Sequence, residues 1–154
     1  MFDVWCVLMG IFVATSSGCG TLPALPPADL DAAGWRVQQG QAVWQPPGKR
    51  PELAGDLLLA TNGSGGLFVS FSKAPFSLVT ARVEGGDWQI DFGSADYTGR
   101  GRGTPPTRFA WFQLPKVLAG APATRPWNFT RYGANNWRLE NAQTGEFLEG
   151  ELQP

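Results

Sequence analysis

The sequence predicts an all-β protein: an antiparallel, incompletely closed (half) β-barrel of about ten strands with at most one short helix. Three observations support this fold class. Short runs in which apolar and polar residues alternate recur along the chain, Gly, Pro and Asn separate most of them, and helical periodicity is nearly absent. The 154 residues include 20 Gly and 13 Pro, a composition that suits tight turns.

The first four strands are expected between residues 35 and 84. The folded part begins at Trp35, and the first strand carries an irregularity at Gly40 before Pro46 and Pro47 end it. A turn rich in residues that tolerate positive φ follows the second strand at 61–66. The expected strands are 35–44, 52–60, 67–72 and 77–84.

The fifth strand shows the clearest alternation. Trp88, Ile90 and Phe92 fall on one face, and the polar residues between them fall on the other, so one face of the sheet is expected to be dry. The same spacing pairs further apolar residues: Phe109 with Trp111, Trp127 with Phe129, and Trp137 with Leu139.

Two segments in the second half depart from this pattern. Residues 114–120 have Pro115 near the start, Gly120 at the end and leucines four apart, which predicts one short helix. Residues 99–103, Gly-Arg-Gly-Arg-Gly, offer amides and two arginines to an anion, but they lack the strand-then-helix context of a phosphate loop. We therefore expect a solvated hairpin tip there.

The N-terminus is typical of an exported protein. The apolar run Val4–Ala14 has the length of a signal-peptide core and falls short of the ~20 residues that a membrane-spanning helix needs. It is followed by Ser16-Ser17-Gly18-Cys19, which resembles the bacterial lipobox, although Ser16 stands where Leu is usual. The resemblance implies a signal peptide at 1–18 and a mature Cys19 carrying three acyl chains, which anchor almost irreversibly. The alternative is an ordinary secreted protein cut between residues 14 and 18.

Residues 19–34 are expected to form a lipidated tether, and residues 35–154 the β-barrel-like domain. Prolines and alanines without a steady period favour a flexible connection, while an arm packed on the domain near Leu30 is an equal alternative. Gly20 follows the cysteine where an Asp would favour retention in the inner membrane, so the resemblance points to the periplasmic face of the outer membrane.

Composition argues against several function classes. The chain has 12 Lys and Arg against 13 Asp and Glu, and removal of residues 1–18 takes only Asp3, so the mature chain is formally neutral. A neutral chain is a poor partner for nucleic acid. The absence of His removes the commonest general base and the commonest transition-metal ligand. We expect no catalytic residue, no cofactor and no metal site.

The domain resembles the LolB family of outer-membrane lipoprotein receptors. The residues that carry the resemblance are Trp35, Val37, Gly40 and Val43 in the first strand, then Leu114-Pro115, Leu118, Gly120 and Pro122. It implies a hydrophobic cavity that takes the acyl chains of lipoproteins from a periplasmic carrier and passes them into the outer membrane. It also implies a protruding loop with an exposed apolar residue, for which the Gly-rich loop ending at Leu67-Phe68 is the candidate.

The sequence leaves two ways to cover the apolar face of the sheet. An open sheet needs a hydrophobic ligand to cover this face, whereas a closed sheet covers it with its own residues. The first case predicts an anchored, non-catalytic carrier of acyl chains or similar amphiphiles, and the second a structural or interaction lipoprotein with a packed β-sandwich core. The expected apolar lining consists of Trp88, Ile90, Phe92, Phe109, Trp111, Trp137 and Leu139.

Overall fold

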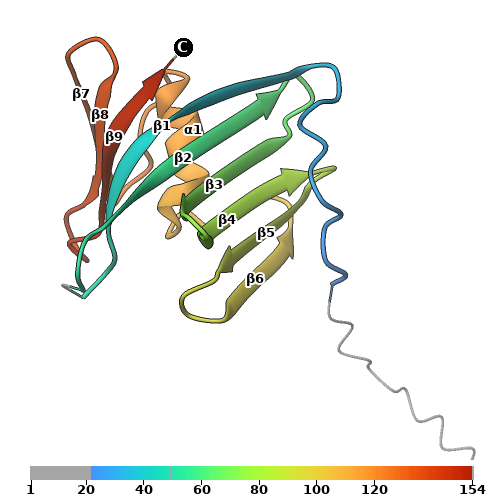
Figure 1. Cartoon of the computed structure of the whole chain (residues 1–154), viewed down its shortest axis with the longest axis horizontal. Coiled ribbons are helices and arrows are strands. Elements are labelled where there is room, and N and C mark those ends of the chain that lie inside the picture. Colours follow the sequence, from blue (N-terminus) through green and yellow to red (C-terminus); the bar gives the residue numbers. More distant parts are fainter. Residues whose placement is uncertain (1–21, 49, 154) are drawn as a thin grey trace, which may run out of the picture.

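The protein is an open antiparallel sheet that curls around one short helix (Figure 1). This computed structural model describes residues 22–48 and 50–153, and within them the sheet has nine strands. The predicted half-barrel with at most one helix is therefore confirmed. The strands are β1 (Trp35–Gln45), β2 (Leu53–Asn62), β3 (Leu67–Lys73), β4 (Phe76–Glu84), β5 (Asp87–Phe92), β6 (Tyr97–Arg102), β7 (Trp127–Tyr132), β8 (Asn136–Asn141) and β9 (Phe147–Gln153), and the helix is α1 (Ala110–Leu118).

The sheet consists of two meanders joined at β1. The strand order is β6-β5-β4-β3-β2-β1-β9-β8-β7, so β1 pairs with β2 on one side and with β9 on the other. The edge strands β6 and β7 do not pair with each other. The chain between these two edges contains α1, which crosses the concave side of the sheet (Figure 1). In the part of the chain that the structure describes, no helix has the length and apolar character to cross a bilayer.

The register places the apolar residues of each strand on the concave face. Ile90 lies opposite Ala81 and Gly99, and Leu139 lies opposite Phe129 and Leu148. Directly opposed residues point to the same side of a sheet, so these positions continue one apolar face from β4 to β6 and from β7 to β9. The alternation predicted for Trp88, Ile90 and Phe92 is confirmed.

The helix fills the hollow of this face. The Trp111 ring stacks on Phe71 with their centroids 5.3 Å apart, and it meets the edge of Trp44 at 5.4 Å. Phe112, Leu114 and Val117 are buried beside it. The core therefore lies between one sheet and one helix, and not between the two packed sheets of a sandwich.

The helix begins earlier than predicted, and Phe109 and Trp111 do not lie on a strand. Phe109 is the N-cap and Trp111 belongs to the first turn. Seven of the nine helical residues are buried, including Gln113 and Pro115. The helix therefore lacks the polar, solvent-exposed face whose 3.6-residue period would reveal it in the sequence. Only the C-terminal half of the helix, with its leucines, was visible as a pattern.

The Gly-Arg-Gly-Arg-Gly segment is also not a hairpin tip. Residues 97–102 form the edge strand β6, paired along its length with β5. A Cβ atom on Gly101 would lie 2.5 Å from the ring of Trp88. The glycine therefore makes room for the indole on the concave face, and the arginines of the motif alternate to the outer face.

Two glycines allow the halves of the sheet to join tightly. Gly40 of β1 lies opposite Leu152 of β9, and Gly150 of β9 lies opposite Ala42 of β1. A Cβ at Gly40 would collide with the backbone oxygen of Glu151, and one at Gly150 with the backbone oxygen of Gln41. Backbone cannot move aside as a flexible side chain can, so β1 and β9 depend on both glycines for their close approach.

We expect Gly150→Ala to lower the free energy of unfolding by about 2–3 kcal/mol or more, because the added methyl forces β1 and β9 apart. Urea denaturation followed by tryptophan fluorescence measures the loss. Gly63→Ala is the matched control, since no atom lies within 4 Å of a Cβ at this turn position, and its effect should stay within about 0.5 kcal/mol. Equal midpoints for the two variants would contradict the packing described at this junction.

Candidate functional site

An apolar pocket opens at one end of the half-barrel. It has a volume of about 470 Å³, within the usual range for small-molecule sites. Three segments form it: the connection from β1 to β2, the turn from β5 to β6, and the residue that precedes α1. The lining residues are Trp44, Pro46, Pro47, Arg50, Pro51, Leu53, Phe92, Ser94, Ala95, Tyr97 and Phe109.

Aromatic rings build the inner wall of this pocket. The Phe92 ring lies 5.8 Å from Trp44, 6.0 Å from Tyr97 and 6.0 Å from Phe109, measured between centroids. Phe92 and Phe109 are half-buried, and Tyr97 is 43% exposed. The prolines of the β1–β2 connection fix φ, so this side of the pocket is held in shape before a ligand arrives.

The structure separates the predicted lining residues into two groups. Phe92 and Phe109 line the pocket. Trp88 is half-buried, with its ring 5.9 Å from Phe112. The other four are fully packed into the interior: Ile90, Trp111, Trp137 and Leu139. Sequence reasoning missed Trp44, Tyr97 and the prolines, for which the only signal was the Pro-Pro pair directly after an aromatic strand end.

The Gly-rich loop does not present an apolar tip. Leu67 is buried in the core, and Phe68 is half-buried within β3. The tip before them is polar, because the Asn62 side chain accepts hydrogen bonds from the backbone N–H groups of Ser64 at 3.2 Å and Gly66 at 2.6 Å. This predicted insertion loop therefore lacks the exposed residue that it would need.

An exposed apolar side chain occurs instead at Phe76, which is 69% exposed and more exposed than any other large apolar residue described. It begins β4, opposite Lys73, after the turn at Ala74-Pro75. In an antiparallel meander the start of β4 and the end of β5 lie at one end, and the N–H of Gly93 donates to the carbonyl of Leu78 there. Phe76 thus lies at the same end of the sheet as the pocket.

The described part of the predicted tether packs against the sheet. Its backbone N–H at Leu25 donates to the Gln89 side chain at 2.9 Å, and the carbonyl of Leu22 accepts from Arg100 at 3.3 Å. Gln89 is buried although it lies on the outer face of β5. Residues 22–34 therefore run as an arm beside β4–β6 (Figure 1). The predicted signal peptide, the predicted lipobox and Cys19 lie outside the described residues.

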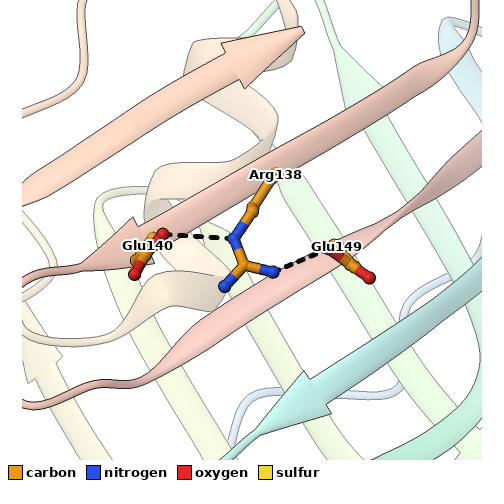
Figure 2. A network of polar contacts seen from close by, with 3 residues as sticks. All are labelled: Arg138, Glu140 and Glu149. Carbon is orange, nitrogen blue, oxygen red and sulfur yellow. Dashed lines mark hydrogen bonds and ion pairs between the residues drawn. The ribbon is translucent and has the colours of Figure 1, made fainter. Parts of the chain in front are cut away.

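A polar network lies on the outer face of β8 and β9. Arg138 donates to Glu140 at 3.1 Å and to Glu149 at 2.7 Å, as Figure 2 shows, and its guanidinium lies 3.9 Å from the centroid of the Phe147 ring. Partial burial lowers the pKa of Arg138, but the hydrogen bonds and charges of the two carboxylates outweigh it and raise this pKa. Both carboxylates are thus engaged by one cation, an arrangement that ties two strands together.

A buried carboxyl group stands behind the pocket wall. Glu146 is 7% exposed and accepts a hydrogen bond of 3.1 Å from the indole N–H of Trp44. Burial raises the pKa of Glu146 to about 7, and the hydrogen bond from Trp44 works in the opposite direction. Near neutral pH the ionisation of this group is therefore coupled to the position of a pocket residue.

We expect stability to depend on the ionisation of Glu146. Its pKa is higher in the folded protein than the ordinary value of 4.5, so the folded state binds the proton more tightly. The corresponding stability is complete below pH 4.5 and is lost as the pH rises through about 7, a change on the order of 3 kcal/mol. Urea denaturation at pH 5 and pH 8 should show this loss, and Glu146→Gln should flatten it, whereas the exposed control Glu52→Gln should not.

Comparisons with known proteins do not identify a family for this chain. No protein-family model matches the sequence. No curated protein gives a significant match to it either.

Proposed function

We propose that the protein is a lipoprotein anchored on the periplasmic face of the outer membrane that binds an acyl chain, or a similar amphiphile, in the end pocket. The observation that carries this proposal is the pocket of about 470 Å³ with an aromatic inner wall. Burial of each methylene group contributes about 0.8 kcal/mol, so several methylenes in the pocket suffice for measurable affinity. The activity is non-catalytic.

The proposed mechanism is transfer along a gradient of hydrophobic burial. The pocket is open to solvent and its lining residue Tyr97 is exposed, so part of a bound chain stays in contact with water. A bilayer buries the whole chain, so the chain is bound more weakly by the protein than by the membrane. Such a protein can accept a chain from water or from a carrier and release it into a bilayer.

Phe76 suits the delivery step of this mechanism. It is exposed at the pocket end of the sheet, and Lys73 lies opposite it in the register. An aromatic ring beside a long cationic side chain is the combination that favours the membrane interface. We propose that Phe76 takes the role first assigned to Leu67 and Phe68.

The partners in this proposal follow from the family resemblance and from the anchor. Cys19 would carry the acyl chains that hold the protein to outer-membrane lipids. Incoming lipoproteins would supply the bound chain through a periplasmic carrier, which gives the protein a role in lipoprotein localisation and insertion. Nucleic acid is not a partner, because the mature chain is formally neutral.

One observation favours a second candidate, an envelope lipoprotein with a structural or interaction role. Trp111 and its neighbours on α1 fill the concave face, so the centre of the half-barrel is already covered without a ligand. In this case the end pocket would be a surface hollow. Binding experiments separate the two candidates.

We expect Tyr97→Glu to weaken binding of a fluorescent fatty-acid analogue about tenfold, because it places a charge in the pocket mouth. The test uses the polypeptide from Gly20 onward, which retains every strand and the helix that the structure describes. Val37→Glu is the control, since Val37 has nearly equal exposure, at 41%, and does not line the end pocket. If the unmodified chain binds no analogue, the structural candidate is favoured.

We expect Cys19→Ser to move the protein from the membrane fraction to the soluble fraction and to remove the mass of the acyl chains. Cell fractionation and mass spectrometry of the intact protein measure both effects. Thr21→Ser, close in sequence and conservative, should change neither. Unaltered fractionation and mass in the Cys19 variant would show that the anchor is not at this cysteine.

A further inference from the structure

We infer that the end pocket selects amphiphiles with an anionic head, such as a carboxylate or a phosphate, over neutral or cationic ones of equal chain length. This inference rests on the proposed function and adds the ligand class. The pocket combines apolar walls with Arg50 as a lining residue, and the Arg108 guanidinium lies against the lining ring of Phe109, a combination that suits the two parts of an anionic amphiphile.

The first cation belongs to the pocket itself. Arg50 is the single charged side chain among the lining residues that the structure describes. The side chain of Gln45 donates a hydrogen bond to the backbone carbonyl of Arg50, which fixes the loop at this point. The Arg50 residue is exposed, and its guanidinium has five N–H donors with which it can bind an anion.

A second cation lies against a ring that lines the pocket. The guanidinium of Arg108 lies 4.7 Å from the centroid of the Phe109 ring, and Phe109 lines the pocket. Arg108 is exposed and is not itself a lining residue, but the contact with the ring holds its side chain beside one. Arg50 comes from the β1–β2 connection and Arg108 from the segment before α1, so the two cations come from different segments of the chain.

The acidic residues nearest in sequence do not complete the lining. Glu52 follows Pro51, and Asp96 precedes Tyr97, but neither carboxylate lines the pocket. The remaining polar lining group is Ser94, whose hydroxyl can also donate to an anion. A carboxylate or phosphate at the mouth would meet donors and cations, whereas an ammonium would meet like charge.

The test compares ligands that share a sixteen-carbon chain and differ only in the head. Palmitate, methyl palmitate and hexadecylamine each displace the neutral fluorophore N-phenyl-1-naphthylamine from the chain that begins at Gly20. We expect palmitate to bind about threefold to tenfold more tightly than the ester, and the amine to bind most weakly, with the differences shrinking at high salt. Palmitoyl lysophosphatidic acid against the corresponding phosphocholine lipid shows whether a phosphate head is accepted as well as a carboxylate.

In the double variant Arg50→Gln and Arg108→Gln, the ratio of palmitate affinity to ester affinity should fall by about threefold to tenfold, to near one. Arg36→Gln, exposed at the other end of the sheet, is the matched control and should keep the preference. Equal binding of all three heads by the unmodified chain would overturn the anionic class but leave the proposed function standing. Binding of none would overturn both, and an equal loss for all heads in the double variant would show that the arginines act through the fold.

Discussion

The contact between α1 and the concave sheet is the interaction on which the rest of the structure depends. An open antiparallel sheet with one apolar face is unstable in water until something covers that face. Here Trp111 provides the cover, with its ring stacked on Phe71 of β3 and set against the edge of Trp44 of β1. These two strands are central in the sheet order, so one helical residue ties the middle of the sheet to the chain that joins its two edges.

This covering decides where a ligand can bind. Because the helix occupies the centre of the hollow, the apolar space at this end of the half-barrel stays open beside the start of the helix, at Phe109. The end pocket is therefore a property of the helix start and of the two loops beside it. Trp44 belongs both to the core contact and to the pocket wall, which links the packing of the centre to the shape of the site.

The fold class and the inward face of most strands could be predicted because polar residues alternate with apolar ones along each such strand. The residues between Trp88, Ile90 and Phe92 are polar, and this contrast reveals a period of two. The same reasoning failed for Phe109 and Trp111, since a helix buried on nearly all sides has no such contrast. The residues of the candidate site were harder to predict from the sequence, because Arg50, Phe92 and Phe109 are distant along the chain and only the strand order brings them together. The role of Gly101 required the register that places it beneath Trp88.

The arm of residues 22–34 has a consequence for how far the domain can travel. These thirteen residues could span about 45 Å if fully extended. While they lie against β4–β6, this length does not add to the distance between the domain and the N-terminal end of the chain. The hydrogen bonds that hold them are few, and two of them come from arginines near the surface, Arg82 and Arg100. In the proposed anchored form, these contacts would keep the domain close to the membrane, and release of the arm would let the domain reach farther from its anchor without unfolding the sheet.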